Sequence, residues 1–198
     1  MLVIAIPFFY GHVYLNFKYL ANIFTQFVLH LSYSNLYNMS KVFEEPKALT
    51  SVAKFHDTFK LPVLEEPIMP SKERCELRVN LLQEELDELK EAIENNDLVE
   101  VADALSDIQY VLSGAILEFG MGSRFKALFD EVQRSNMSKT CKTKEEAERT
   151  QVHYKETKGT ESYIEEKNDE YLVFRKADSK VLKSVNYSEA DLKSIVEG

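Results

Sequence analysis

The sequence predicts an all-α helical bundle followed by a small C-terminal α+β tail, and three observations support this fold class. Long segments after Pro46 and up to about residue 139 repeat apolar side chains at helical spacing. Capping side chains or glycines stand at the limits of these segments. Strand-like spacing appears only in the last part of the chain. With 198 residues, the chain is long enough for one compact domain, or two at most.

Four helices are expected before residue 140. The first follows Pro46, and the second runs from a cap at Ser71 to about Asn95. The third begins after the turn Asn95–Asp97 and ends before Gly120, and Ser123 is expected to cap the fourth. Their expected apolar stripes are Val52, Phe55 and Phe59; Leu82, Leu86, Leu89 and Ile93; Val101, Leu105, Ile108, Leu112 and Ile116; and Phe125, Leu128, Phe129 and Val132. These helices would form an antiparallel bundle core of four or five helices, counting the short helix of the tail.

The C-terminal tail has a different pattern. Thr143 and Glu146 have the spacing of a capping box and start a short charged helix that Gly159 ends. The runs 171–174 and 181–182 are predicted to pair as a β-hairpin. Ser188 with Asp191 repeats the capping spacing before a last helical turn. The predicted domains are therefore an apolar extension at 1–38, a helical domain at 39–140 and an extension at 141–198.

Residues 1–38 differ from the rest of the chain, because they hold 10 of its 22 Phe and Tyr residues and no Asp, Glu or Arg. A membrane-spanning helix needs about 20 mostly apolar residues, and Pro7, Gly11 and Lys18 interrupt this segment. A secretory signal starts with a basic segment, which is missing here. A third interpretation is that Met39 is the true start. A membrane partner is expected only if residues 1–38 are retained.

The composition is acidic, with 33 Asp and Glu against 24 Lys and Arg and a formal net charge of −9. This charge argues against a dedicated nucleic-acid-binding protein, which carries a basic patch. The two cysteines, Cys75 and Cys141, form no CxxC motif. We expect them to be free thiols in a reducing compartment, and therefore expect a cytoplasmic protein.

Acidic side chains form a stripe on each of the two long predicted helices. At about 100° per residue, Glu84, Glu85 and Glu88 lie within one arc beside the apolar stripe of the second helix. On the third helix, Glu100, Asp103 and Asp107 follow at i, i+3 and i+7. A short turn folds the two helices antiparallel, which brings the stripes face to face. The alternative interpretation is a pair of solvated surface faces.

Carboxylates held this close repel one another unless a cation compensates them. Oxygen ligands without His or Cys select a hard cation, so Mg²⁺ is expected rather than Zn²⁺. Inward Glu residues on facing helices are a known way to build such a site in a bundle. Mg²⁺ also accepts phosphate oxygens as ligands, so the pattern points to phosphoryl chemistry.

Four further polar residues are candidate contacts for an anionic substrate. Asn136 and Lys139 continue the apolar stripe of the fourth helix and suit a ligand with phosphates and hydroxyls or a base; alternatively, Lys139 answers the helix dipole. Arg78 is either a phosphate contact or a structural partner of an acid. His56 is either a substrate contact or a hydrogen-bonded histidine at the edge of the core.

The acid motif resembles the EExxE…ExxD signature of the MazG-type and phosphoribosyl-ATP pyrophosphohydrolase-like all-α NTP pyrophosphohydrolases. The resemblance covers about residues 50–140, and a weaker one extends over Lys180–Tyr187. It lies in Glu84–Glu88, Glu100–Asp103, Phe55–Phe59, Asp107–Val111 with Gly114, Phe119–Gly120 and Arg134–Lys139.

This resemblance implies a bundle completed as a homodimer or homotetramer, and Mg²⁺-dependent hydrolysis of a nucleotide between the α and β phosphates, with Mn²⁺ as a substitute metal. By motif position it implies the following roles: metal ligands Glu85, Glu88, Glu100 and Asp103, with Asp107 as an additional acid; catalytic Glu84 as the second-shell carboxylate or base for the attacking water; and Asn136 and Lys139 as sugar and phosphate contacts.

Two alternatives stay open at this point. One is the phosphoribosyl-ATP pyrophosphohydrolase of histidine biosynthesis, and the other is a non-catalytic helical interaction module. The 11 residues between Glu88 and Glu100 are marginally fewer than usual for the resembled proteins, so the relative height of the two acid pairs is also open.

Overall fold

The structure is a computed structural model that describes residues 42–198. The apolar segment 1–38 lies outside the described residues, and the three interpretations of it stay predictions. Within residues 42–198, no helix is both long enough and apolar enough to cross a membrane.

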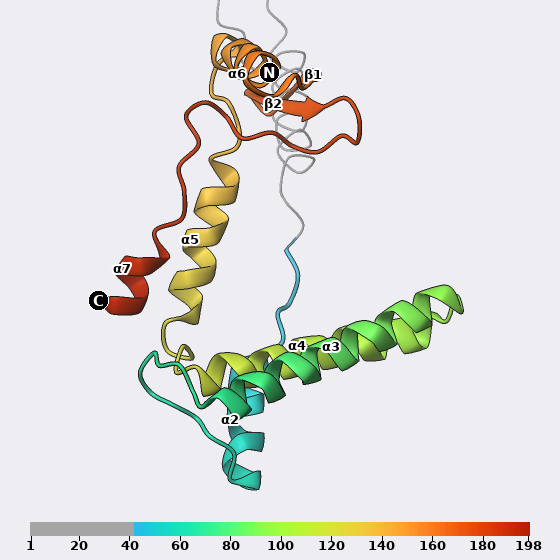
Figure 1. Cartoon of the computed structure of the whole chain (residues 1–198), viewed down its shortest axis with the longest axis vertical. Coiled ribbons are helices and arrows are strands. Elements are labelled where there is room, and N and C mark those ends of the chain that lie inside the picture. Colours follow the sequence, from blue (N-terminus) through green and yellow to red (C-terminus); the bar gives the residue numbers. More distant parts are fainter. Residues whose placement is uncertain (1–41) are drawn as a thin grey trace, which may run out of the picture. The chain divides into compact units, whose positions relative to one another are not determined.

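Residues 45–198 form one compact unit of six helices and one hairpin, which confirms the predicted fold class (Figure 1). The first four helices make up the predicted helical part, and the rest belongs to the predicted tail. In chain order the elements are α2 (Ala48–Phe59), α3 (Lys72–Glu94), α4 (Leu98–Glu118), α5 (Phe125–Met137), α6 (Lys144–Lys158), β1 (Ser162–Lys167), β2 (Glu170–Arg175) and α7 (Leu192–Glu197).

The helix starts are set by side-chain caps at most of the predicted positions. Ser71 Oγ accepts a hydrogen bond from the Arg74 amide at 3.4 Å, and Asp97 Oδ1 accepts one from Val99 at 3.0 Å. Thr143 Oγ1 accepts from the Glu146 amide at 3.2 Å. These bonds satisfy amides that a helix leaves without partners in its first turn.

Two predicted caps were wrong. The residue before α5 is Arg124, which forms no side-chain cap bond, because the chain makes an extra turn after Ser123 before the helix begins. In front of α7, Asp191 is itself the cap and accepts from the Ser194 amide at 3.2 Å. Ser188 instead bonds to Ser138 of α5.

α3 and α4 lie side by side as an antiparallel pair, and α2 packs against α4 (Figure 1). The loop between α2 and α3 runs along the end of α4, where the Leu64 amide donates to Leu117 O at 3.0 Å. Gly120 has φ +68°, and a Cβ atom there would lie 1.9 Å from Glu66 O. Only glycine fits this approach, so Gly120 fixes the loop against the helix end.

The apolar stripes of α3 and α4 are only partly covered within one chain. Ala92 is buried between the helices, but Leu86 and Ile93 of the predicted core stripe are 49% and 62% exposed. On α4, Leu98 and Leu105 are 80% and 52% exposed. Two helices bury only the strip between them, so a wide apolar face that was predicted as core stays open on this pair.

The β-hairpin pairs different segments from those predicted. β1 and β2 are antiparallel, and the turn residues Asn168 and Asp169 both have positive φ, as a type I′ turn requires. Val181 forms only an isolated bridge to Phe174. The β1 sequence, Ser-Tyr-Ile-Glu-Glu-Lys, does not alternate apolar and polar residues, because its first three residues are half-buried and its last three are charged and exposed, so it was not predicted as a strand. α6 packs on both strands over a small core of Cys141, Ala147, Val173 and Leu182.

Candidate functional site

The acidic stripes lie on two helices that pack against each other, and five of the six acids are exposed: Glu84, Glu88, Glu100, Asp103 and Asp107. Glu85 is half-buried at the helix contact. Burial raises the pKa of its carboxyl, and the nearby charges of Asp107, Glu88, Glu84 and Asp103 raise it further. The two helices therefore bring five carboxylates into one electrostatic neighbourhood centred on Glu85.

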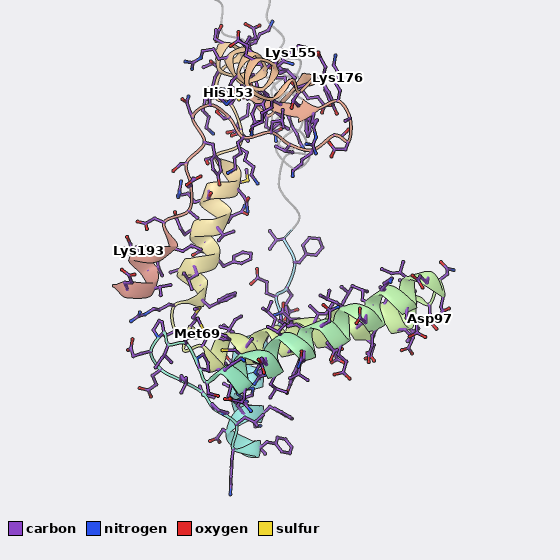
Figure 2. The ribbon with its side chains drawn as sticks, in the orientation of Figure 1. Met69, Asp97, His153, Lys155, Lys176 and Lys193 are labelled. Atoms are coloured by element: carbon purple, nitrogen blue, oxygen red, sulfur yellow. The ribbon has the colours of Figure 1, made fainter. Side chains whose placement is uncertain are left out.

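Glu100 lies at the edge of this group. It sits in the first turn of α4, where its amide donates to Asp97 Oδ1 at 3.2 Å. In Figure 2 the label Asp97 marks the turn that joins α3 to α4, and the label Met69 marks the other end of the pair, shortly before α3 begins. Asp107, and not Glu100, is foremost among the charges acting on Glu85. The charges that raise the pKa of Glu85 therefore include the additional acid Asp107, whereas the predicted ligand Glu100 is not among them.

The six acids are not neutralised by basic side chains. None of them forms an ion pair with another residue of the described part of the chain. Among residues 42–198, no three His, Cys, Asp or Glu side chains are gathered closely enough to hold a metal ion. The donor set is nevertheless all oxygen and carries uncompensated negative charge, and this chemistry fits a hard cation such as Mg²⁺.

The last acid of α4, Glu118, has the opposite surroundings. It is 1% exposed, and Arg78 Nη2 donates to its Oε1 at 2.5 Å. Arg74 Nε donates to Oε2 at 3.1 Å, and Arg74 Nη2 also contacts Oε1. Burial favours a raised pKa for Glu118, but the hydrogen bonds and charges of Arg78 and Arg74 outweigh it and lower the pKa below its usual value.

His56 joins the same buried cluster. Its ring is 2% exposed, and Nε2 lies 3.2 Å from Arg78 Nη2 while Nδ1 lies 2.8 Å from Pro62 O. Because Arg78 can only donate, Nε2 accepts and Nδ1 carries the proton that is donated to Pro62 O. Gly114 makes room for this contact, since a Cβ atom there would lie 2.7 Å from Arg78 Nη1. Both predicted substrate contacts therefore have partners inside the fold.

An apolar cavity of about 270 Å³ opens between α2, α3 and α4. Phe55 and Tyr110 line it with their rings edge to face at 5.7 Å, and Leu81 forms another part of its wall. Leu81 is one helical turn before Glu85, and Tyr110 is one turn after Asp107. The cavity is thus a short distance along both helices from the acid group.

Asn136 and Lys139 lie at the C-terminal end of α5, which packs with α7. Lys139 Nζ donates to Asn136 Oδ1 at 2.7 Å, so the two side chains form one polar pair. Within the described residues, neither side chain bonds to any of the six acids. The structure brings this pair together but leaves its predicted meeting with the acids untested.

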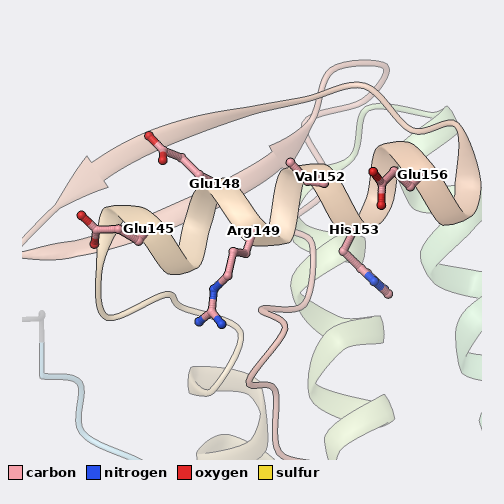
Figure 3. Close-up of a pocket in the computed structure, with 6 residues that line it drawn as sticks. All are labelled: Glu145, Glu148, Arg149, Val152, His153 and Glu156. Atoms are coloured by element: carbon pink, nitrogen blue, oxygen red, sulfur yellow. The ribbon is translucent and has the colours of Figure 1, made fainter.

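A separate hollow lies along α6 (Figure 3). It is open to solvent, and all of its lining residues come from that one helix: Glu145, Glu148, Arg149, Val152, His153 and Glu156. None of the predicted site residues reaches it. We assign no chemistry to this groove.

The sequence analysis missed the buried partner of Arg78. Glu118 is the one charged residue in the apolar run 111–120, and Arg74 and Arg78 are one turn apart on the preceding helix. When an apolar run is buried, a single acid within it is buried too, and a buried carboxylate needs a basic partner. That pattern was a usable signal for the cluster.

Residues 52–136 match the family model described as phosphoribosyl-ATP pyrophosphohydrolase. The matched range contains α3, α4, all six acids and Asn136, and it ends before Lys139 and the C-terminal elements. An uncharacterized protein of Acanthamoeba polyphaga mimivirus is 23% identical to this chain, in an alignment that covers 74% of this chain and 94% of that protein.

Proposed function

Because residues 52–136 form a domain of the phosphoribosyl-ATP pyrophosphohydrolase family, within the MazG-like all-α NTP pyrophosphohydrolase superfamily, we propose that this chain hydrolyses a nucleoside triphosphate between its α and β phosphates. The products would be a nucleoside monophosphate and pyrophosphate. The observation that carries the proposal is the group of carboxylates that two antiparallel helices gather around Glu85 without a basic partner.

The proposed metal ligands are Glu85 and Glu88 of α3 with Glu100 and Asp103 of α4, and Asp107 is a fifth candidate. When bound, Mg²⁺ would compensate the phosphate charge and lower the pKa of a coordinated water. Glu85 is the central ligand of the proposed site, because the charges of four neighbouring acids act on it. Asp107 has stronger support from the structure than Glu100, since it is the first of those four.

Glu84 is the proposed base. It is exposed, next to Glu85, and close enough to influence the charge of Glu85. A carboxylate oxygen of Glu84 would take a proton from water while the water oxygen bonds to phosphorus. With attack at the α phosphorus, the bond from this phosphorus to the α–β bridging oxygen breaks, and that oxygen leaves with the β and γ phosphates as pyrophosphate, while the water oxygen stays in the nucleoside monophosphate.

The substrate contacts are proposed to surround the acids. The apolar cavity beside Phe55 and Tyr110 suits an aromatic base, because it offers aromatic edges and little polar surface. Asn136 and Lys139 are proposed to contact the sugar and the phosphates. For Arg78 and His56 we propose an indirect contribution, in which their buried bonds to Glu118 and Pro62 hold the cavity wall.

We also propose that a second copy of the chain covers the open faces of α3 and α4, giving a homodimer or homotetramer. Leu86, Ile93, Leu98 and Leu105 are large apolar side chains exposed on this helix pair, and a matching pair from a second copy would complete a four-helix bundle. Light scattering coupled to size exclusion tests this directly. A monomer at micromolar concentration would contradict it.

The function is tested with a panel of NTPs, dNTPs and phosphoribosyl-ATP incubated with the full chain and Mg²⁺. Separation of the products should show a monophosphate and pyrophosphate in equal amounts from at least one substrate. A preference for phosphoribosyl-ATP would identify the histidine-pathway activity instead. If no substrate yields pyrophosphate, the proposal fails.

The competing class is a non-catalytic helical interaction module, whose acids only solubilise it or bind a basic partner. A thermal melt separates the two, because a cation that binds only the folded state raises the midpoint. We expect Mg²⁺ to raise the midpoint at constant ionic strength. The interaction module would be favoured if the melting midpoint is the same in MgCl₂ and in NaCl at equal ionic strength.

A further inference from the structure

The chain returns to the end of α5 after the β-hairpin. Residues Ser184–Asp191, called the return segment below, bond to that helix end at several points. Ser135 is 4% exposed, and its Oγ shares a hydrogen bond with Tyr187 Oη at 2.9 Å. The Ser188 amide donates to Ser138 Oγ at 3.0 Å. Ser138 Oγ in turn donates to Ser135 O at 2.7 Å, which closes the last turn of the helix.

Charged groups strengthen the same contact. Arg134 Nη2 donates to Glu189 O at 2.9 Å, and Arg134 Nε donates to Glu131 at 2.7 Å. Glu131 also accepts from the Asp191 amide at 2.9 Å. Hydrogen bonds from Arg134 and then from Asp191 lower the pKa of Glu131 to about 2, so this carboxylate stays charged at any neutral pH.

These contacts fall on one face of α5 and leave another face open. Glu131, Arg134, Ser135 and Ser138 follow the helical spacing i, i+3, i+4 and i+7, so they share the face that the return segment covers. Asn136 lies about 100° further round from Ser135, and it is exposed. The return segment therefore fixes the rotation of the helix end without covering Asn136.

We propose that the return segment positions the nucleotide-contacting end of α5, and that Tyr187 and Ser138 are positioning residues acting through Asn136 and Lys139. This inference rests on the proposed function, which assigns Asn136 and Lys139 to the sugar and phosphates. It gives a role to a segment that lies outside the matched range 52–136.

A helix end needs such support if it is to hold a substrate. The last carbonyls of a helix have no partners within it, and terminal turns open most easily. Lys139 follows the end of α5 and Asn136 lies in its last turn. A displacement of about 1 Å in a positioning group can lower turnover by about a hundredfold. The return segment limits this movement by bonding to Ser135 and Ser138.

The test compares two tyrosine variants of the full chain. Tyr187→Phe removes the hydroxyl that bonds to Ser135. Tyr163→Phe is the matched control, because its hydroxyl also makes one hydrogen bond to a serine, donating to Ser179 Oγ at 3.3 Å, and neither residue belongs to α5 or to the return segment. Amide hydrogen exchange of residues 135–140 should become severalfold faster in Tyr187→Phe and stay unchanged in Tyr163→Phe. Equal exchange in all three proteins would overturn the inference.

Kinetics then separate positioning from general stability. For the best substrate of the panel, we expect Tyr187→Phe to raise KM about threefold to tenfold, as the loss of one hydrogen bond predicts, and to leave the Mg²⁺ concentration for half-maximal activity unchanged. In an Asn136→Ala/Lys139→Ala background the same change should alter KM by less than about twofold, because both groups that it positions are gone. The positioning role would be contradicted if Tyr187→Phe raised KM as much in that background as in the native protein, or did not raise KM in the native protein at all. A native chain that hydrolyses no nucleotide would overturn the proposed function and this role together.

Discussion

Two regions of the α3 and α4 helix pair surround acidic side chains in opposite ways. Midway along the pair, Glu85 and its neighbours repel one another and have no ion-pair partner among the described residues. At the end away from the turn, Glu118 is buried between two arginines. The same two helices thus carry one carboxylate that is compensated by positive charge inside the fold and one group of carboxylates without a compensating charge.

This difference separates structural acids from candidate functional acids on physical grounds. A buried carboxylate with two guanidinium donors contributes to the fold, and removing it would leave buried positive charge. A group of unpaired carboxylates weakens the fold and persists where an external cation or ligand compensates it. The predictions below test the contrast from the largest expected effect to the smallest.

The largest effect is expected for Glu118→Ala. Removing one partner of a buried ion pair typically costs about 3–5 kcal/mol, and here it leaves both Arg74 and Arg78 uncompensated. Urea unfolding should show the loss in the free energy of unfolding. Glu91→Ala, at an exposed position of α3, is the control and should change stability by less than about 0.5 kcal/mol. Similar losses in the two variants would abolish the contrast.

Glu85→Ala should lower activity and leave stability intact, the opposite of Glu118→Ala. We expect turnover to fall at least about a hundredfold, or about 2.7 kcal/mol in the barrier, while the fold is kept or slightly stabilised because repulsion is relieved. The rise of the melting midpoint with Mg²⁺ should also be lost. Activity is measured as pyrophosphate release. An Glu85→Ala protein with native turnover would refute the assignment of Glu85 as a metal ligand.

Gly114→Ala tests the packing behind the buried cluster. A Cβ atom there would meet Arg78 Nη1 at 2.7 Å and His56 Nε2 at 3.1 Å, so the Arg78 contact must shift. Overpacking of this kind costs about 1–3 kcal/mol. Gly122→Ala is the control, since its Cβ would meet only the flexible end of Leu117 at 3.1 Å. Thermal unfolding of both variants would show whether the loss is specific to position 114.

The smallest effect is a pH dependence. Since the pKa of Glu118 is lowered in the folded state, the folded chain binds fewer protons there than the unfolded chain. The stabilisation is complete above the pKa of the unfolded group, about 4.3, and is lost as the pH falls through the lower folded value. Between pH 6 and pH 3, the free energy of unfolding should therefore fall less steeply with decreasing pH in Glu118→Gln than in the native protein. Parallel curves would contradict the direction of this shift.

Local signals in the sequence were enough to place the helices of the acid pair. Ser71 and Asp97 cap α3 and α4 as predicted, and Glu84, Glu88, Asp103 and Asp107 all contribute to the raised pKa of Glu85. Spacing alone could not show which apolar face is covered within one chain. Leu86 and Ile93 look like core in a helical pattern, but their exposure depends on what packs against them.

Long-range pairings were the part that the sequence could not supply. Glu118 finds its arginines forty or more positions earlier in the chain, and Tyr187 finds Ser135 across α6 and the hairpin. β1 was missed because its second half, Glu-Glu-Lys, is charged and exposed throughout, so the strand lacks the alternation that a half-buried strand shows. The predicted meeting of Asn136 and Lys139 with the acids remains a prediction for the same reason, since it depends on contacts beyond any local pattern.

The bond between Ser138 and Ser188 has one more consequence. The chain leaves α5 at Ser138 and returns to it at Ser188. Residues 139–187 therefore form a branch whose two ends are held together by hydrogen bonds. The entropy cost of closing a loop grows only with the logarithm of its length. A peptide tag or a fluorescent reporter spliced into the solvent-facing turn at Asn168–Asp169 would therefore lengthen the branch without pulling on α5, which makes this turn the natural place to label the protein.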